Sequence, residues 1–267
     1  MDFNGKLVAL WTVIRREVLR FFRIWTQTLL PPVITQSLYF VIFGSFIGSQ
    51  IRDVNGVSYM AFIVPGLVMM SVITSSYANV SGSFFGAKFQ KNYEEWLVSP
   101  TPNWVVLTGY VIGGVLRGLL VGLIVFGVSF FFVQPVIHDF AMICIFILLT
   151  ALLFSLGGLL NAIYATKFDD ISIVPTFVLT PLTYLGGVFY SIKDLPEFWQ
   201  NVSRLNPVLY MVDGFRYGFF GIADVSVWQS VAVLVLFTFV ILSSTLYLMK
   251  KGVGLKNGIV RTRSSDG

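Results

Sequence analysis

The chain has 267 residues, of which 56% are hydrophobic and 12% are charged. This balance excludes an ordinary soluble domain, and the long uncharged apolar runs indicate an all-α, polytopic helical membrane protein. The net charge of +5 does not require a nucleic-acid partner, because basic cytoplasmic loops of membrane proteins give the same excess. A single cysteine, Cys144, and a single histidine, His138, exclude an intramolecular disulfide and a catalytic set built on paired histidines.

Residues 1–28 are predicted to form an amphipathic helix at the cytoplasmic interface of the membrane. Over residues 5–25, apolar side chains recur at spacings of three and four, and the arginines fall on the opposite face. The aromatic rings would enter the acyl boundary, while Arg16, Arg20 and Arg23 would contact lipid phosphate or a partner protein. A plain membrane anchor is the simpler alternative. No cleavable signal peptide is evident here.

Six transmembrane helices are predicted within residues 29–249, at about 29–48, 58–82, 104–133, 140–165, 171–190 and 228–249. The Gly157-Gly158 pair and Ala162 in the fourth span offer small-residue contacts to a neighbouring helix. The fifth span contains two prolines and the Gly186-Gly187 pair, so we expect a broken helix that lines a pathway or moves.

Arg117 is the one ionisable residue inside the six predicted spans. An intramembrane charge is a functional candidate. Alternatively, Arg117 lies near the cytoplasmic interface and extends its charged end to water.

Residues 83–103 form the longest polar break in the first half of the chain. We expect a short helix over residues 88–97, stopped by Ser99-Pro100. The residues at its exposed end are Glu94, Glu95, Trp96 and Leu97. A solvated loop is the alternative.

Residues 193–221 are too apolar for a loop and too charged to cross a membrane, so they predict a helical hairpin. Asp194 is expected to cap the first helix, and Asn206 to cap the second with Pro207 at its first position. The second helix, from Pro207 to Phe220, spans roughly 21 Å, short of a bilayer core of about 30 Å. We therefore expect a re-entrant hairpin, which enters the membrane and returns on the same side. Asp213 and Arg216 are three apart on this helix and are expected to neutralise each other.

Basic residues set the expected orientation. The two termini, the 83–103 break and the turn at 167–170 carry 13 lysines and arginines, and the opposite side carries four. This bias predicts that both termini, including the basic tail 250–267, are cytoplasmic and that the hairpin is external.

Several segments resemble the type-2 ABC exporter permeases. These are "FVIFGSFIG" and "YMAFIVPGLVMMSV" in the first two spans, the run of two acids, Trp, Leu, Val, Ser and Pro from Glu94, and "LPEFWQ" with "LNPVLYMVDGFR" in the hairpin. In the hairpin, the resemblance rests mainly on Asn206, Pro207, Tyr210, Asp213 and Arg216.

The resemblance implies a bacterial inner-membrane permease that pairs with a second copy, or a close relative, and with two ATPase subunits. The segment with Glu94, Glu95, Trp96 and Leu97 would then be the coupling helix that docks in the ATPase, with the N-terminal arginines beside it. Mg-ATP would bind the partner, because this chain has no phosphate-binding loop of the GxxxxGK[ST] type and no cofactor is expected in it.

Aromatic residues of the first and fifth spans are candidates for the lining of a transport path, although they would also suit a lipid-facing surface. They are Tyr39, Phe40, Phe43, Phe177, Tyr184 and Phe189. The expected cargo is an amphipathic lipid, glycan or drug. An ion-coupled carrier would need intramembrane acids, which the predicted spans lack, and a membrane-embedded enzyme would have only His138-Asp139 as a weak polar cluster.

Overall fold

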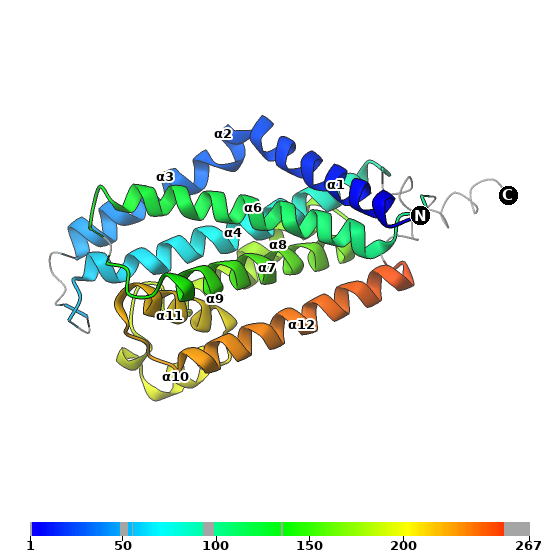
Figure 1. The fold of residues 1–267 in the computed structure, drawn as a ribbon. Coiled ribbons are helices and arrows are strands. Elements are labelled where there is room, and N and C mark those ends of the chain that lie inside the picture. Colours follow the sequence, from blue (N-terminus) through cyan, green and yellow to red (C-terminus); the bar gives the residue numbers. More distant parts are fainter. Residues whose placement is uncertain (1, 49–52, 55, 93–98, 135, 254–267) are drawn as a thin grey trace.

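Figure 1 shows the computed structural model, a bundle of helices that run along one long axis. The structure describes residues 2–48, 53–54, 56–92, 99–134 and 136–253, and these ranges contain no β-strand. The all-α class expected from the composition is therefore confirmed.

Four helices are long and apolar enough to cross a bilayer: α4 (Tyr59–Phe89), α6 (Asn103–Ser129), α7 (Phe140–Tyr164) and α12 (Val227–Lys251). They lie at four of the six predicted positions. The main difference is that α4 continues past the predicted end at residue 82. A multi-pass membrane protein follows from these four helices.

The other two predicted spans are interrupted helices. The first comprises α2 (Trp25–Thr28), α3 (Leu30–Tyr39) and the π-helix η1 (Phe40–Ile47). The fifth comprises α8 (Phe168–Val174), the π-helix η2 (Pro175–Leu179) and α9 (Thr180–Tyr184), so it is broken as expected.

The fifth segment ends at Tyr184 rather than at the predicted residue 190. Its chain then turns at Gly187, whose positive φ of 73° favours glycine. From Phe168 to Tyr184 an uninterrupted helix would span roughly 25 Å, less than a bilayer core. Helix length alone therefore supports four spans, and the six-span count stays a prediction.

The central helix α4 packs against α6 and α7 through small residues. A Cβ on Gly158 of α7 would lie 2.4 Å from the carbonyl oxygen of Tyr77, so the two backbones are in direct contact. A Cβ on Gly118 of α6 would clash with the side chain of Ser76, so α6 also lies close to α4. Ala162 is fully buried. The predicted small-residue contact is thus confirmed, and α4 is its partner.

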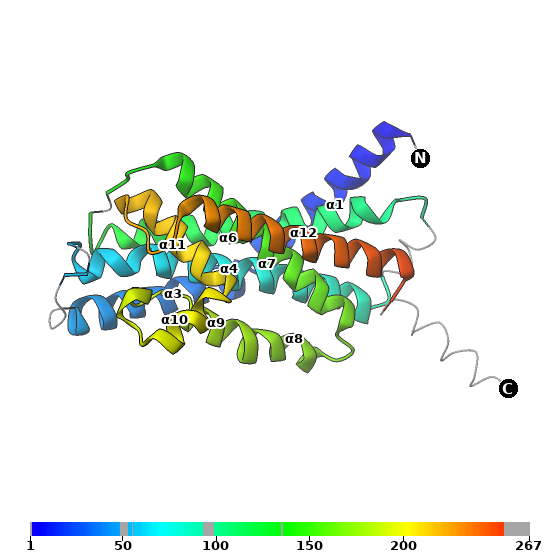
Figure 2. The ribbon, with the colours of Figure 1, turned by 90° about the horizontal axis from the view of Figure 1, so that it is seen from below.

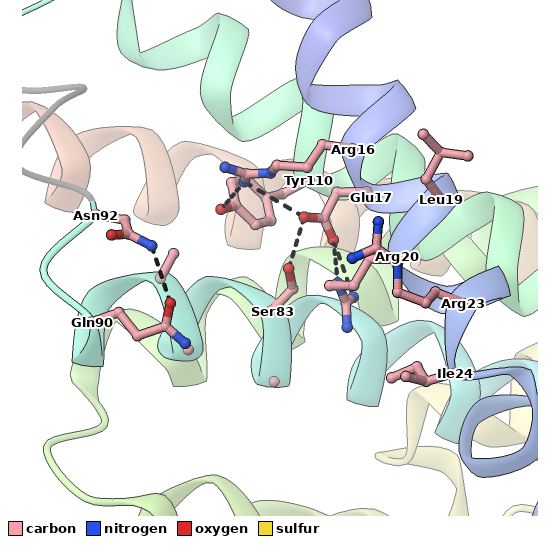
Figure 3. Close-up of a pocket in the computed structure, with 13 residues that line it drawn as sticks. Arg16, Glu17, Leu19, Arg20, Arg23, Ile24, Ser83, Gln90, Asn92 and Tyr110 are labelled. Carbon is pink, nitrogen blue, oxygen red and sulfur yellow. Dashed lines mark hydrogen bonds and ion pairs between the residues drawn. The ribbon is translucent and has the colours of Figure 1, made fainter.

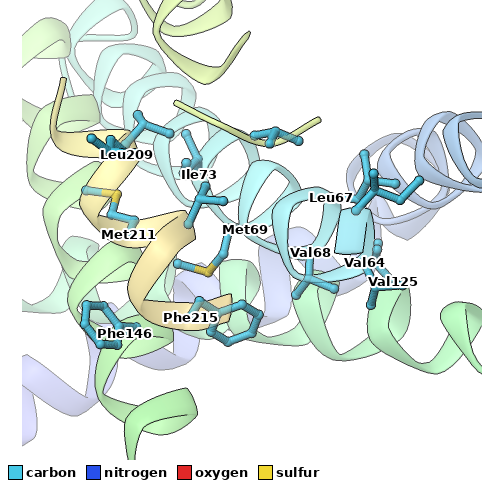
Figure 4. Close-up of a cluster of buried hydrophobic side chains, with 14 of the residues drawn as sticks. Val64, Leu67, Val68, Met69, Ile73, Val125, Phe146, Leu209, Met211 and Phe215 are labelled. Carbon is cyan, nitrogen blue, oxygen red and sulfur yellow. The ribbon is translucent and has the colours of Figure 1, made fainter. Parts of the chain in front are cut away.

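Large apolar side chains fill the space between these helices and α11 (Pro207–Phe220) (Figure 4). Met69 and Ile73 of α4, Phe146 of α7 and Met211 and Phe215 of α11 are all fully buried there. Helix α11 is therefore part of the bundle core and not a surface loop, whereas most side chains of α10 (Glu197–Arg204) are exposed.

The start of α1 (Phe3–Arg23) and the end of α12 lie at the same end of the bundle, and the hairpin lies toward the opposite end (Figure 1). Figure 2 shows α8 and α9 along one edge of the bundle. The hairpin consists of the 3₁₀ turn η3 (Ile192–Asp194), α10 (Glu197–Arg204) and α11.

The start of α10 corrects the prediction that Asp194 caps this helix. Asp194 lies in η3, and α10 begins after Pro196 with no side-chain cap. Leu195 is extended (ψ 153°) because a residue that precedes proline is disfavoured in the helical region. For α11, in contrast, the bounds and the cap by Asn206 are as predicted.

Candidate functional site

A basic pocket with a volume of about 480 Å³ lies between α1 and α4 (Figure 3). Its lining residues are Arg16, Glu17, Leu19, Arg20, Arg23, Ile24, Gly82, Ser83, Gly86, Ala87, Gln90, Asn92 and Tyr110. All three arginines expected to be functional in the N-terminal helix are thus brought together.

Glu17 organises this pocket. Its side chain is 1% exposed and lies between Arg20, at 3.1 Å from Nη2 to Oε2, and Arg16, at 3.5 Å from Nη2 to Oε1. The Ser83 hydroxyl donates a hydrogen bond of 2.7 Å to Oε1. A buried carboxylate with two cations and a hydroxyl donor is a compensated charge.

The two arginines also fasten α1 to the bundle. Arg20 Nη2 donates to Oδ1 of Asn79 on α4 at 2.8 Å, and Arg16 donates to the Tyr110 hydroxyl on α6. Arg16 and Arg20 therefore bond to the bundle, while Arg23 and the rings of Trp11 and Trp25 are exposed. The sequence analysis missed Glu17, although its position three residues before Arg20 places the two side chains on the same face of α1.

The predicted coupling segment lies mostly outside the described residues, so the structure does not place Glu94, Glu95, Trp96 and Leu97. Its expected start is corrected. Lys88 and Phe89 are the last residues of α4, because Lys88 Nζ donates to the main-chain oxygens of Ile163 and Ala165, at 2.8 and 2.7 Å, and holds α4 against the end of α7.

The turn from α7 to α8 is closed by Asp170. Its Oδ2 accepts hydrogen bonds from the main-chain N–H groups of Thr166 and Lys167, at 2.7 and 2.9 Å. These bonds, the first from Thr166, hold the pKa of the Asp170 carboxyl below its ordinary value. Phe168 packs edge-on against Phe89, with ring centroids 4.8 Å apart. The end of α4 therefore contacts the turn through this ring as well as through Lys88.

Arg117 is 8% exposed, so it does not extend to the surface as one of the two interpretations required. Its Nη2 donates to the carbonyl oxygen of Thr28 at 3.0 Å, which ties α6 to the junction of α2 and α3. This contact gives Arg117 a structural role between helices.

Four of the six candidate aromatic residues form one cluster. The hydroxyls of Tyr39 and Tyr184 are 3.1 Å apart, and the rings of Phe43 and Phe189 have centroids 4.6 Å apart. Tyr39 and Tyr184 also each contact the ring of Phe189, at 5.8 Å. The cluster joins the first interrupted helix to the segment after the fifth.

The other two aromatic candidates are elsewhere. Phe40 is fully buried and stacks on Phe132, so the prediction that it lines a path is wrong: it belongs to the hydrophobic core. Phe177 is 73% exposed and lies outside the cluster.

In the hairpin, Asn206 acts at both ends of its amide. Oδ1 accepts from the N–H of Val208 at 3.0 Å, and Nδ2 donates to the oxygen of Leu182 at 2.6 Å. The Tyr210 hydroxyl donates to the oxygen of Arg204 at 2.7 Å. These bonds fix the turn between α10 and α11 and attach it to α9.

Asp213 and Arg216 do not form a direct ion pair in the described part of the chain, although the two charges lie close enough to attract each other as expected. Asp213 accepts from the N–H groups of Asp224 and Val225, at 2.8 and 2.9 Å. Arg216 Nη2 donates to the oxygen of Gly187 at 2.7 Å, and its guanidinium lies 3.8 Å from the ring centroid of Phe62. Each charge thus has its own partners.

Asp224 is a further residue that the sequence analysis missed. It accepts from the Ser191 hydroxyl at 2.7 Å and pairs with Lys193 at 3.3 Å. Together with Asp213, which accepts from its N–H, Asp224 joins the segment before α10 to the segment after α11.

The comparisons with known proteins decide the family. The profile of the family described as "ABC-2 type transporter" matches residues 8–220. The chain belongs to this family. The inner membrane transport permease YadH of Escherichia coli K12 is 58% identical to it over 250 residues, which cover 94% of this chain and 98% of YadH.

More distant relatives carry another name. Nodulation protein J of Neorhizobium galegae is 24% identical over 219 residues, or 80% of this chain and 81% of that protein. The protein of the same name from Rhizobium meliloti is 24% identical over 220 residues, or 78% and 79%. As an ABC-2 family member with an inner membrane permease as relative, the chain is a multi-pass transporter subunit, as the sequence motifs indicated.

The family match spans most of α1 and continues to the end of α11. It therefore includes the basic pocket, the aromatic cluster and the hairpin. The outermost helix α12 lies beyond the matched residues and is little buried in the bundle.

Proposed function

We propose that this ABC-2 family chain is the permease subunit of an ATP-driven exporter in a bacterial inner membrane. The observation that carries the proposal is the match of residues 8–220 to the ABC-2 type transporter family, together with 58% identity to the transport permease YadH. The absence of a phosphate-binding loop from the sequence assigns ATP hydrolysis, with Mg-ATP, to a separate subunit.

The arrangement of the chain supports an orientation for this exporter. The start of α1 and the end of α12 lie at one end of the bundle, away from the hairpin. The segments assigned to the side of the termini carry 13 basic residues. By the positive-inside rule, both termini face the cytoplasm and the hairpin faces outward, where α11 enters the membrane without crossing it.

The ATPase contact in this proposal is the segment with Glu94, Glu95, Trp96 and Leu97. It follows α4 directly, and Lys88 fastens the last turn of α4 to α7. A push on the segment would therefore reach the central helix. The arginines of α1 also hold α4 in place, because Arg20 donates a hydrogen bond to Asn79 of α4.

The substrate class that fits is an amphipathic lipid-, glycan- or drug-like molecule, handled by a permease dimer surrounded by membrane lipid. The cluster of Tyr39, Phe43, Tyr184 and Phe189 supports it, because aromatic faces stack on sugar rings and accept acyl chains. An ion-coupled carrier is less well supported, since α4, α6, α7 and α12 contain no Asp or Glu.

The proposal is tested with the Glu94→Lys, Glu95→Lys double variant, co-expressed with an ABC ATPase subunit from the same genome. Reversal of two charges at an interface costs several kcal/mol, so we expect roughly a tenfold or greater loss of ATPase co-purification and of ATP turnover. The Asp194→Lys, Glu197→Lys variant is the matched control, because both residues are exposed near the hairpin end.

Normal membrane insertion of both variants, with loss of the ATPase from the first alone, supports the assignment. Equal ATPase association in the two variants would rule out the 94–97 segment as the contact. Failure of the parent chain to retain any ABC ATPase would overturn the exporter proposal itself.

A further inference from the structure

The basic pocket between α1 and α4 has an excess of positive charge. Three arginines and one carboxylate, Glu17, line it, so the lining residues carry a net charge of +2. Arg16, Arg20 and Arg23 follow one another at spacings of four and three, so one face of α1 presents them all. Planar guanidinium groups match the oxygens of a phosphate better than an ammonium does.

The pocket is also partly preorganised. Glu17 is buried and hydrogen-bonds both Nε and Nη2 of Arg20, at 3.3 and 3.1 Å, which fixes the direction of that guanidinium. Arg23, in contrast, is exposed and makes no hydrogen bond or ion pair with the described part of the chain. An anion in the pocket would meet one fixed cation and one that is still available.

The wall formed by α4 is open and apolar. A Cβ added at Gly82 or at Gly86 would meet no atom within 4 Å, so no neighbouring element fills this face of α4. Ala87 continues the wall, and Leu19 and Ile24 of α1 form the apolar part of the opposite side. The ligand that fits has an apolar portion next to its anionic group.

The position of α1 indicates where such a ligand comes from. Trp11 and Phe22 are exposed on this helix, at 65% and 49%, and Trp25 at the start of α2 is 53% exposed, as in helices that lie in the interface of a bilayer. The pocket is then at the depth of the lipid headgroups. A carboxylate of a partner protein would satisfy the charge but would leave the apolar wall empty.

We propose that this pocket binds the phosphate group of an anionic phospholipid from the cytoplasmic leaflet. Arg23 and Arg20 contact the phosphate, and the glycerol and first acyl carbons lie against Gly82, Gly86 and Ala87. Bound lipid fastens α1 to α4 beside the end of α4. The site belongs to the isolated chain and does not depend on an ATPase partner; only the choice of leaflet rests on the orientation proposed above.

The test uses the full chain in detergent, without an ATPase, titrated with dioctanoyl phosphatidylglycerol, dioctanoyl phosphatidylcholine or inorganic phosphate. Native mass spectrometry resolves the bound species. Arg23→Gln removes the available cation, and Gly86→Leu fills the pocket without a change in charge. Their matched controls are Arg15→Gln, an exposed arginine of α1 outside the pocket, and Gly127→Leu, where an added Cβ also meets no atom within 4 Å.

We expect phosphatidylglycerol to bind more tightly than phosphatidylcholine, and Arg23→Gln to weaken it about tenfold, as for one lost hydrogen bond to a charged group. Gly86→Leu should weaken it at least as much. Both controls should stay within about twofold of the parent chain, since neither changes a contact to the ligand. Thermal unfolding of all four variants checks that each is folded.

Competition by inorganic phosphate at the same site shows whether the pocket recognises free phosphate or the phosphate group of a lipid. If phosphate displaces the lipid and shows the same dependence on Arg23, the arginines recognise the phosphate group itself, as proposed. Binding of phosphate without any binding of phosphatidylglycerol would overturn the lipid assignment. Equal binding of the two lipids, equal loss in Arg15→Gln and Arg23→Gln, or no binding of either anion would overturn the site.

Discussion

Arg117 Nη2 donates a hydrogen bond of 3.0 Å to the carbonyl oxygen of Thr28, on a different helix. In an uninterrupted α-helix this oxygen would accept from the N–H of the fourth residue onward. That residue is Pro32, which has no N–H. The arginine of α6 therefore supplies the donor that the proline of α3 lacks.

This relationship predicts a coupling between Arg117 and Pro32. Arg117→Met should lower the free energy of unfolding by about 1–3 kcal/mol, because the buried Thr28 oxygen loses its donor. In a Pro32→Ala background the new N–H at residue 32 can replace that donor, so the same change should cost less. Denaturant unfolding of the four proteins in detergent measures the cycle, and an equal cost in both backgrounds would contradict it.

Asp213 and Arg216 are predicted to act separately. Asp213→Ala leaves the N–H groups of Asp224 and Val225 without an acceptor, at about 1–3 kcal/mol each. Arg216→Ala removes the donor to Gly187 and the contact with Phe62. The double variant should therefore melt below either single one. If the double variant is more stable than Asp213→Ala, the two charges interact directly in the parent protein, as their helical spacing suggests.

The contact of α7 with α4 predicts different outcomes for two glycine substitutions. Gly158→Ala places a methyl group 2.4 Å from the Tyr77 oxygen, so the helices must separate, at about 1–3 kcal/mol. Gly127→Ala is the control, because its new methyl meets no atom within 4 Å and alanine favours the helix. Thermal unfolding of the two variants should shift in opposite directions or leave the control unchanged. Equal destabilisation would show that the close approach carries no cost.

Phe40 and Phe43 are predicted to differ although they lie one turn apart. Phe40→Ala should cost about 3–5 kcal/mol of unfolding free energy, because Phe40 is fully buried and stacks on Phe132. Phe43→Ala should leave a folded protein and change which amphipathic compounds stimulate ATP turnover of the exporter complex. Phe177→Ala, at an exposed ring outside the cluster, should change neither property. An unaltered stimulation profile in Phe43→Ala would argue that the cluster only packs against lipid.

The sequence by itself determined the helical membrane class, the positions of the four long helices and the bounds of α11. These follow from local properties. Uninterrupted apolar runs have no alternative to a helix in lipid, and Asn206-Pro207 supplies a cap and a fixed φ at the start of α11. Prolines and paired glycines in the fifth span likewise predicted a break in that helix.

Only the tertiary structure decided the partners of the charged and aromatic residues. The periodicity of α1 separates arginines from rings, but the buried Glu17 and Asn79 of another helix decide that Arg20 bonds to the bundle while Arg23 stays exposed. Spacing places Asp213 beside Arg216, yet main-chain groups from residues 187, 224 and 225 bind them instead. A buried charge binds the nearest unsatisfied polar groups, and these belong to segments that only folding brings together.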